Sequence, residues 1–260
     1  MHAPILVLTA LVWEAQAVLR SLDNVRDAGQ RTWRGNSGRC QVIVSSGGVG
    51  IRSARAIIEI YKDIRPSVIL SVGCSGALVP ELSAGQLLLA KAVSMYGGDD
   101  RTDLKTFPSD PNLLAAAKSA GMASGLNPVV GSIFTSQSVL STGREKDMCQ
   151  RQTSCIAVEM ESAVHAEFAA GAGVPFLAIR PILDTMRMTI TLIKGIIGSK
   201  GEVNVLRALR RVGKHPKELV PLMRLQRCRR LVSVSIATIS SAFFPVLESV
   251  VLADLATRRR

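Results

Sequence analysis

This chain of 260 residues contains few aromatic side chains, few histidines and no paired cysteines. Aromatic residues make up 4% of it, which leaves little material for a nucleic-acid binder that stacks on bases. With three histidines and five cysteines that form no Cys-x-x-Cys pair, the sequence indicates no metal cluster, and we expect no metal or other cofactor. Cysteines this sparse favour a reduced compartment, so we expect a cytoplasmic protein.

The sequence predicts neither a secretion signal nor a nucleotide-binding glycine motif. Residues 3–13 are apolar, but no Lys or Arg precedes them and Glu14 follows, so we expect a buried first strand that turns into a helix. The glycine-rich turn at 47–50 matches neither Gly-x-Gly-x-x-Gly nor a P-loop. The chain shows no internal repeat and no low-complexity tract.

The composition that is present is typical of a folded protein, with an unusual charge. Apolar residues make up 47% and charged residues 20%, which excludes a disordered chain, and the length suits one large α/β domain or two small ones. The formal net charge is +12, yet residues 1–184 hold 17 Lys+Arg against 16 Asp+Glu, whereas residues 185–260 hold 15 against 4. A nearly neutral body therefore carries a strongly basic C-terminal segment.

Short β-rich runs alternate with amphipathic stretches, which is the pattern of βαβ units. Several of the runs are almost continuously apolar, as strands covered on both faces are. The expected strands are 5–9, 41–45, 68–72, 86–92, 131–135, 156–159 and 176–179. The expected helices are 14–22, 53–64, 112–120, 162–172, 203–212 and 216–231. The sequence thus predicts an α/β fold.

Polar residues follow the expected strands directly. Ligands of open α/β sheets bind at the carboxyl ends of the strands, so we expect these residues to share one edge of the sheet. Four carboxylates there are more acid than a nearly neutral body would place at random. The residues are Glu14, the turn 47–50, Cys74, Ser75, Glu159, Met160, Glu161 and Asp184.

Each of these groups allows a functional and a plainer interpretation. Glu159 and Glu161 suit the vicinal hydroxyls of a sugar with Met160 packed on its face, or they satisfy the dipole of a helix N-terminus. Asp184 can hold a proton for a departing heterocycle if its surroundings raise its pKa, or it is a turn residue. The turn 47–50 can bind an anion, or it is a tight turn without a ligand.

The motifs also follow one another in a specific order. They are Glu14, the glycine turn 48–54, Val-Gly-Cys-Ser-Gly at 72–76, Val-Glu-Met-Glu-Ser-Ala at 158–163, Val-Pro-Phe-Leu-Ala-Ile-Arg at 174–180, and Asp184. Across residues 4–184 this order resembles the nucleoside phosphorylase/nucleosidase superfamily. The resemblance implies a three-layer α/β/α fold with a central mixed, largely parallel sheet, and a homo-oligomer.

Carried over residue by residue, the resemblance implies roles. Asp184 would protonate the purine at N7, and Glu14 would position or deprotonate the attacking water. Glu161 would hold the ribose hydroxyls, with Met160 packed beneath the sugar, in a transition state of oxocarbenium character that carboxylates stabilise. The further expected contacts are Cys74, Ser75, Gly76, Val139, Glu159 and Arg180 around the substrate, and Gly48 and Gly50 on the phosphate or water side.

The sequence departs from the family pattern at several positions. Cys74 stands where hydrolytic relatives often have Ser, and Val139 where relatives place an aromatic residue that stacks on the base. Phosphorolytic relatives have an arginine where this chain has Ser71, and an early Gly-Asp-Pro-x-Arg segment that is absent here. The last two differences favour water over phosphate as the nucleophile, and phosphorolysis stays an alternative.

The tail resembles the hopanoid-associated members of the superfamily, which remove adenine from adenosylhopane in bacterial hopanoid-lipid synthesis. The match lies in Leu-Arg-Ala-Leu-Arg-Arg at 206–211 and in the run from Pro216 to Leu225. We therefore expect residues 1–200 to form the catalytic domain. Residues 201–260 would form a basic helical extension, packed on the body or on a membrane surface.

Two stretches of the tail carry this expectation. Nine cations at helical spacing within 203–230 suit an anionic bilayer, where each contributes about 1 kcal/mol, or they form the solvated face of a packed helix. The uncharged run 231–247 is short and polar for a membrane span of about 20 residues, so we expect a core-packing or interfacial helix.

The sequence thus predicts an enzyme that cleaves the N-glycosidic bond of an adenine nucleoside, in first place adenosylhopane, in the cytoplasm or at the inner face of its membrane. A soluble methylthioadenosine or adenosylhomocysteine nucleosidase and a purine nucleoside phosphorylase are the enzymatic alternatives. A nucleic-acid-binding protein is the non-enzymatic one, because arginine clusters also bind phosphates. Against it stand the missing motif, the few aromatics and the acidic edge, so we expect no nucleic acid as a partner.

Overall fold

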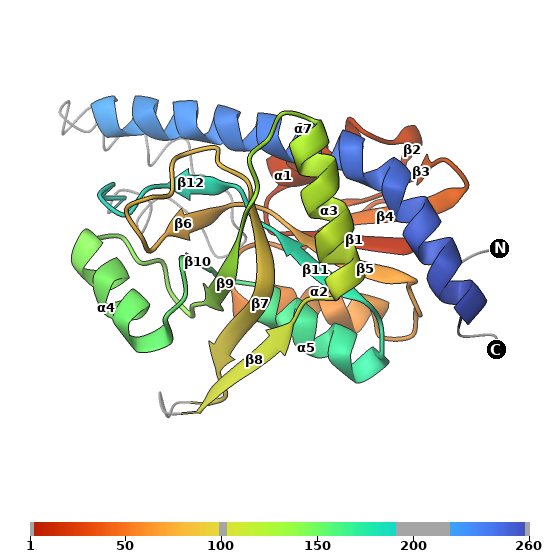
Figure 1. Ribbon diagram of the computed structural model, residues 1–260, viewed down its shortest axis with the longest axis horizontal. Helices are drawn as coiled ribbons and strands as arrows, with labels where there is room; N and C mark the ends of the chain where they lie inside the picture. Colours follow the sequence, from red (N-terminus) through yellow and green to blue (C-terminus); the bar gives the residue numbers. More distant parts are fainter. Residues whose placement is uncertain (1–2, 99–102, 191–218, 258–260) are drawn as a thin grey trace.

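A computed structural model describes residues 3–98, 103–190 and 219–257 (Figure 1). Their strands form one sheet in the order β12-β6-β10-β9-β7-β11-β5-β1-β4-β3-β2, and β8 pairs with β7. Parallel pairing joins β4, β1, β5 and β11 on one side and β7, β9 and β10 on the other. The strands are β1 Ile5–Thr9, β2 Asp23–Asp27, β3 Thr32–Ser37, β4 Cys40–Ser46, β5 Val68–Val72, β6 Ser75–Ala77, β7 Leu88–Tyr96, β8 Leu104–Pro108, β9 Val129–Thr135, β10 Ala157–Glu159, β11 Phe176–Ile179 and β12 Ile182–Asp184.

The apolar strands lie in the middle of the sheet. All five residues of β1 are buried, and the strand pairs in parallel with β4 and β5, so that Val7 faces Val44 on one side and Leu70 on the other. Both faces of such a strand are covered, which is why its sequence is continuously apolar instead of alternating.

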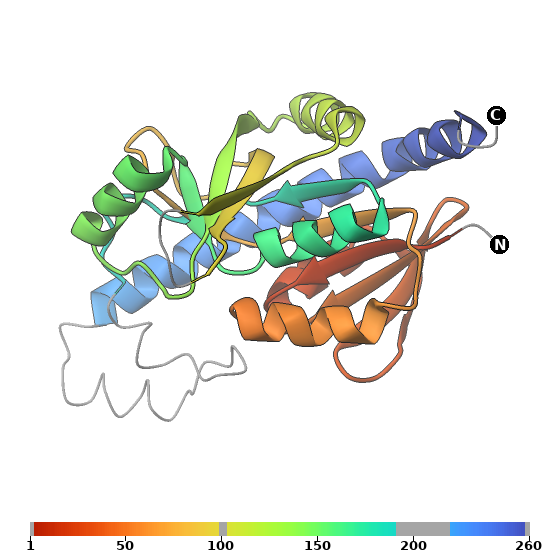
Figure 2. The ribbon, with the colours of Figure 1, turned by 90° about the horizontal axis from the view of Figure 1, so that it is seen from below.

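Helices cover the sheet on both faces (Figure 2). Buried residues of α1 (Val12–Leu19), α3 (Pro111–Ala123) and α7 (Leu219–Thr257) share one core cluster, whereas those of α2 (Ile51–Tyr61) and α5 (Ser162–Ala172) belong to the other. The expected three-layer α/β/α fold with a mixed, largely parallel sheet is confirmed.

A sixth described helix, α4 (Gly143–Thr153), begins at a capping box. The Thr142 hydroxyl accepts a hydrogen bond from the N–H of Glu145 at 3.2 Å, and the Glu145 carboxylate accepts one from the N–H of Thr142 at 2.9 Å. These two bonds satisfy backbone donors that a helix start leaves unpaired. Cys149 then anchors α4 in a small cluster with Phe134 of β9 and Val158 of β10.

Helix α7 is continuous from Leu219, within the expected helix 216–231, through the uncharged run 231–247; residues 216–218 lie outside the described ones. Its residues at spacings of three and four are buried in the core beneath α1 and α3, and Pro245 lies on the exposed side, so core packing is the alternative that the structure shows for 231–247. By length and composition alone, Met223–Ser249 could cross a membrane. The buried apolar residues of 231–247 are Val232, Ile236, Ile239, Phe243, Phe244 and Leu247.

All seven expected strands are present, three with the expected bounds (5–9, 68–72 and 176–179) and four with shifted ends, and further elements appear that were not predicted. These are the edge strand β2 and its neighbour β3, the strands β6, β8 and β12, and helix α4. The expected helix 203–212 and the expected domain boundary at residue 200 lie outside the described residues.

Candidate active site

A pocket opens where β1, β5, β10 and β11 end, and most of the predicted site residues meet there. Its volume is about 140 Å³. Gly48 and Gly50 do not line it, although Val49 between them does. The predicted residues in its wall are Glu14, Cys74, Ser75, Gly76, Val139, Glu159, Met160, Glu161, Arg180 and Asp184.

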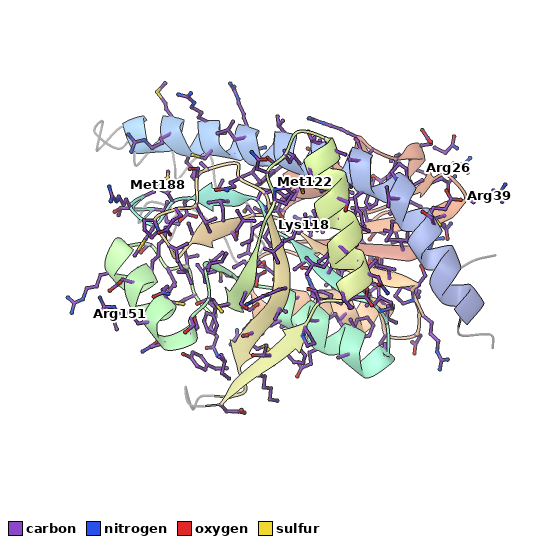
Figure 3. The ribbon with its side chains drawn as sticks, in the orientation of Figure 1. Arg26, Arg39, Lys118, Met122, Arg151 and Met188 are labelled. Atoms are coloured by element: carbon purple, nitrogen blue, oxygen red, sulfur yellow. The ribbon has the colours of Figure 1, made fainter. Side chains whose placement is uncertain are left out.

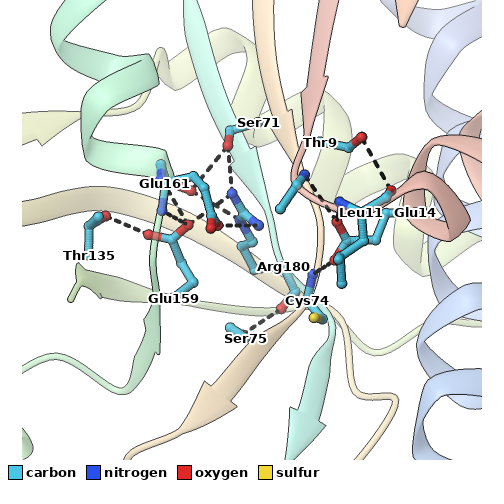
Figure 4. A network of polar contacts seen from close by, with 12 residues as sticks. Thr9, Leu11, Glu14, Ser71, Cys74, Ser75, Thr135, Glu159, Glu161 and Arg180 are labelled. Atoms are coloured by element: carbon cyan, nitrogen blue, oxygen red, sulfur yellow. Dashed lines mark hydrogen bonds and ion pairs between the residues drawn. The ribbon is translucent and has the colours of Figure 1, made fainter. Parts of the chain in front are cut away.

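Arg180, which follows β11, is the cation at the centre of this pocket (Figure 4). Its side chain is 1% exposed, and its Nη2 lies 2.9 Å from a carboxylate oxygen of Glu159. The guanidinium also donates to the hydroxyls of Ser71 at 2.7 Å and Ser162 at 3.0 Å. Burial alone would lower the pKa of Arg180, but the neighbouring Glu159, Glu161 and Glu14 carboxylates raise it, so the cation persists.

Glu159 and Glu161 lie in different surroundings although they are two residues apart. The Glu159 carboxylate accepts hydrogen bonds from the N–H groups of Glu161 at 3.0 Å and Ser162 at 2.8 Å, and from the Thr135 hydroxyl. It thereby caps the start of α5 while it pairs with Arg180. Both of its oxygens accept hydrogen bonds within the protein, in line with the plainer interpretation of this segment as a helix start.

Glu161 has fewer partners and therefore capacity for a ligand. One of its oxygens accepts a hydrogen bond from the N–H of Gly50 at 2.7 Å, and the other lies 3.9 Å from Nη1 of Arg180. Burial and the adjacent Glu159 carboxylate raise the pKa of Glu161. The N–H of the glycine turn is thus occupied by a carboxylate of the protein itself.

Glu14, in the first turn of α1, reaches the same pocket from β1. Its carboxylate accepts hydrogen bonds from the N–H groups of Leu11 at 2.9 Å, Ala10 at 3.2 Å and Cys74 at 2.9 Å. Burial raises the pKa of Glu14 against the lowering effect of Arg180 and these bonds. A buried carboxyl with a raised pKa is suited to accept a proton near neutral pH.

Two glycines let these charged groups approach the backbone. A Cβ at Gly73 would lie 2.4 Å from Nη1 of Arg180 and 3.0 Å from Oε1 of Glu14. A Cβ at Gly76 would lie 3.1 Å from both carboxylate oxygens of Asp184. The segment 72–76 therefore needs its glycines for space.

Asp184 ends β12 at the pocket wall and is 4% exposed. Burial raises the pKa of its carboxyl, while Lys146 of α4 lowers it by charge and by a hydrogen bond to Oδ2. Lys146 was not predicted, because no helix was expected at 143–153. The Thr-x-x-Glu capping signature at 142–145 is the sequence signal that could have placed it.

Cys74 and Val139, the two departures from the family pattern, both line the pocket. Burial, together with the Glu14 carboxylate, raises the pKa of the Cys74 thiol well above its usual range, so the thiol stays protonated. Behind Arg180, the Ser71 hydroxyl lies 2.8 Å from Nδ1 of His165, and burial followed by the charge of Arg180 lowers the pKa of His165 to about 3. His165 is therefore neutral.

Buried carboxylates surround one arginine at the strand ends of a three-layer α/β/α fold, and together with a matching family model this makes the chain an enzyme of the nucleoside phosphorylase and nucleosidase class. A family model extends this assignment along the chain. The chain belongs to the Phosphorylase superfamily, whose model matches residues 4–191.

Individual relatives are similar to most of the chain. A 5'-methylthioadenosine/S-adenosylhomocysteine nucleosidase of Geobacillus thermodenitrificans is 25% identical over 224 residues, which are 80% of this chain and 90% of that protein. The nucleosidase of Neisseria meningitidis, solved with methylthio-immucillin-A, superimposes with a TM-score of 0.72 at 17% identity over 94% of this chain and 99% of its own. Futalosine hydrolase of Helicobacter pylori superimposes with a TM-score of 0.70 at 17% identity, over 95% of this chain and 98% of its own.

Proposed function

We propose that this enzyme hydrolyses the N-glycosidic bond of an adenine nucleoside and releases adenine. The observation that carries the proposal is that Glu14, Glu161 and Asp184 line one pocket with Arg180 between carboxylates. The bond to be broken needs an acid for the leaving base, an acceptor for the ribose hydroxyls and a base for water. The pocket offers one buried carboxyl group for each of these tasks.

Asp184 is the proposed acid. Because burial raises the pKa of its carboxyl, the proton stays on it at higher pH than on an exposed aspartate, and passes to N7 of the purine as the bond to the sugar breaks. The base then leaves as neutral adenine. Glu161, with unused hydrogen-bonding capacity, holds the ribose hydroxyls, and Met160 packs against the sugar.

Water is the proposed nucleophile, with Glu14 as the group that orients it and accepts its proton. Two features disfavour a phosphate dianion here. The N–H of Gly50 already donates to Glu161, and three carboxylates surround the single guanidinium of Arg180. An anion entering this site would meet more negative than positive charge, whereas water meets no such barrier.

The proposed substrate carries an apolar group, in first place the hopane of adenosylhopane. The apolar side chains of Leu11, Leu140 and Ile190 in the pocket wall support it, together with the resemblance of the tail to hopanoid-associated proteins. The relatives named for methylthioadenosine and adenosylhomocysteine favour the second candidate, a soluble thioadenosine substrate. We also propose a homo-oligomer, which size-exclusion chromatography with light scattering would measure.

Incubation of the purified enzyme with adenosylhopane, methylthioadenosine and adenosylhomocysteine, each with and without phosphate, tests the proposal. We expect adenine from at least one substrate in phosphate-free buffer. If no substrate releases adenine, the nucleosidase proposal is wrong; if release requires phosphate, the nucleophile is phosphate. The Asp184→Asn variant should keep its fold by circular dichroism and lose activity by about 10²–10⁴-fold, the usual contribution of a general acid.

A further inference from the structure

A lysine is buried directly behind the proposed acid. Lys146 of α4 is 0% exposed, and its Nζ donates hydrogen bonds to Oδ2 of Asp184, to the carbonyl of Thr185 at 2.8 Å and to that of Met188 at 3.4 Å. An ammonium removed from water is costly unless it is paired and its protons are bonded. The three acceptors provide this compensation.

The lysine also binds the chain segment that follows the acid. Its bonds to the carbonyls of Thr185 and Met188 fix the segment that follows β12, and the N–H of Ile190 donates to the Ser141 carbonyl at 2.9 Å just before α4. Ile190 lines the pocket. Helix α4 thus fixes both the acid and the pocket wall next to it.

We propose that Lys146 is a positioning residue for the general acid: its ammonium orients the Asp184 carboxyl and stabilises the carboxylate that remains after proton transfer. This inference rests on the proposed function. The lysine occupies Oδ2, which leaves Oδ1 to exchange a proton with the substrate. The hydrogen-bonded ammonium lowers the pKa of the Asp184 carboxyl, so this group is a stronger acid than burial alone would allow.

The proton balance closes over one turnover. Asp184 gives its proton to N7, and the electron pair of the glycosidic bond goes to the base, which leaves as adenine. Water adds to the sugar carbon and its proton passes to Glu14. Exchange of one proton with solvent at each carboxyl, in opposite directions, restores the starting state. Lys146 keeps its charge throughout.

Other charged and titratable groups face the acid and remain in any Lys146 variant. The Cys228 thiol of α7 interacts electrostatically with Asp184, and Arg224 and Arg227 of α7 lie near that thiol. The pocket itself adds ionisable side chains from α1, the β5–β6 turn, β10 and the segment after β11. These are Glu14, Cys74, Glu159, Glu161 and Arg180.

The experiment compares kcat as a function of pH in the wild type, Lys146→Met and Lys146→Gln. Methionine removes the charge at similar volume, and glutamine retains hydrogen-bond donors for the carbonyls of Thr185 and Met188. Arg151→Met is the matched control, because Arg151 is an exposed cation that projects outward from the same helix (Figure 3).

In both Lys146 variants we expect the alkaline limb of the profile to move to higher pH, by about 1–3 pH units, because an adjacent cation lowers a carboxyl pKa by about that amount. The plateau of kcat should fall by roughly tenfold, less than the roughly 10²- to 10⁴-fold contribution of a whole general acid. Arg151→Met should match the wild type. A merely structural role would lower kcat without moving the limb.

The outcomes separate this inference from the proposed function. An active wild type whose alkaline limb is unchanged in the folded Lys146 variants overturns the inference alone. Two variants that both fail to fold also overturn it, because the lysine then serves the fold. A wild type that releases no adenine from any substrate overturns the proposed function, and the inference with it.

Discussion

Glu159 and Glu161 illustrate how surroundings assign different tasks to identical side chains. Glu159 accepts hydrogen bonds from two backbone N–H groups and from Thr135, and it pairs with Arg180. Glu161 keeps an oxygen at 3.9 Å from the guanidinium, too far for a hydrogen bond. The first carboxylate therefore supports the site, and the second is available to a ligand.

Glutamine should mainly lower activity at position 161 and mainly lower stability at position 159. Glu161→Gln should weaken ribose binding and lower kcat/KM by about 2- to 10-fold with little loss of stability, because the amide offers one acceptor oxygen where the carboxyl group offers two, and a hydrogen bond is worth about 0.5–1.5 kcal/mol. Glu159→Gln should instead lower the free energy of unfolding by about 3–5 kcal/mol, because it leaves the buried Arg180 without its nearest counter-ion. Steady-state kinetics and urea unfolding of both variants measure the difference.

Equal loss of stability in the two variants would contradict this division. So would a Glu159→Gln enzyme that is as stable as the wild type.

His165 gives the protein a predicted sensitivity to acid. Its pKa is lowered from 6.5 to about 3 by burial, so below pH 6.5 the unfolded chain binds a proton that the folded chain does not. Stability from this residue is present above pH 6.5 and is lost as the pH falls, by about 1.4 kcal/mol per pH unit. Between pH 7 and pH 5, the free energy of unfolding of His165→Asn should fall by about 2 kcal/mol less than that of the wild type. Urea unfolding at the two pH values measures the difference. Parallel curves would contradict the prediction.

The site residues that the sequence predicted are those that directly follow apolar strands. Glu14 lies in the first turn of the helix after β1, and Asp184 lies a few residues after β11, so the buried strands place both near one edge of the sheet. Lys146 reaches Asp184 across 38 positions of the chain. Only the packing of α4 against the sheet brings the two together, and no local pattern reports that packing.

At the scale of elements, helix α7 shows what an apolar pattern can and cannot predict. The uncharged run 231–247 indicated a helix that either packs in the core or lies at an interface. Its buried positions recur at spacings of three and four, which defines a face, but a face alone does not identify what covers it. The packing against α1 and α3 is a tertiary fact.

Replacing a side chain by alanine should cost much more stability on the buried side of α7 than on its exposed side. Phe243 is 0% exposed in the core cluster, so Phe243→Ala should lower the free energy of unfolding by about 3–5 kcal/mol through a cavity. Val234 of the same helix is 60% exposed, and Val234→Ala should change it by at most about 0.5 kcal/mol. Urea unfolding at neutral pH measures both. A similar loss in both variants would mean that α7 is not a core helix.

The elements that the sequence did not predict share a weak apolar signal. All five residues of β2 are exposed at the edge of the sheet, where Arg26 and Arg39 extend outward (Figure 3). Helix α4 buries only Lys146 and Cys149 of its own residues. Where so little apolar surface is buried, periodicity is faint, and pairing or capping fixes the element instead.

At the scale of the whole molecule, the charge is divided between a nearly neutral body and a basic C-terminal segment. On α7, exposed cations lie beside exposed apolar side chains such as Met223 and Leu231, which are 64% and 44% exposed. This combination is typical of helices that bind anionic bilayers. The exposed cations of α7 are Arg224, Arg227, Arg229 and Arg230.

The enzyme should sediment together with anionic liposomes at low salt and stay in the supernatant at high salt. The triple variant with Gln at Arg224, Arg227 and Arg230 should bind about 100-fold more weakly, because each cation near such a surface contributes about 1 kcal/mol. A control triple variant carries Gln at exposed cations away from α7, in or next to helix α2 and in the edge strand β2. It should bind as the wild type does. These residues are Arg26, Arg55 and Lys62.

A wild type that does not sediment with liposomes at low salt would leave the soluble thioadenosine nucleosidase as the better proposal. A salt-dependent shift of DNA or RNA in gels would instead favour nucleic acid as the partner of the basic helix.

The position of α7 in the chain has a consequence for synthesis. Strand β1 and helix α1 leave the ribosome long before α7, yet the cluster that contains them is completed by Val232, Ile236 and Phe243. Until those residues emerge, the parts of α1 and α3 that pack against α7 are uncovered, and the growing chain is exposed to aggregation. A nascent chain stalled before α7 should therefore recruit chaperones, and a reporter fused after residue 218 should be less soluble than one fused after residue 260.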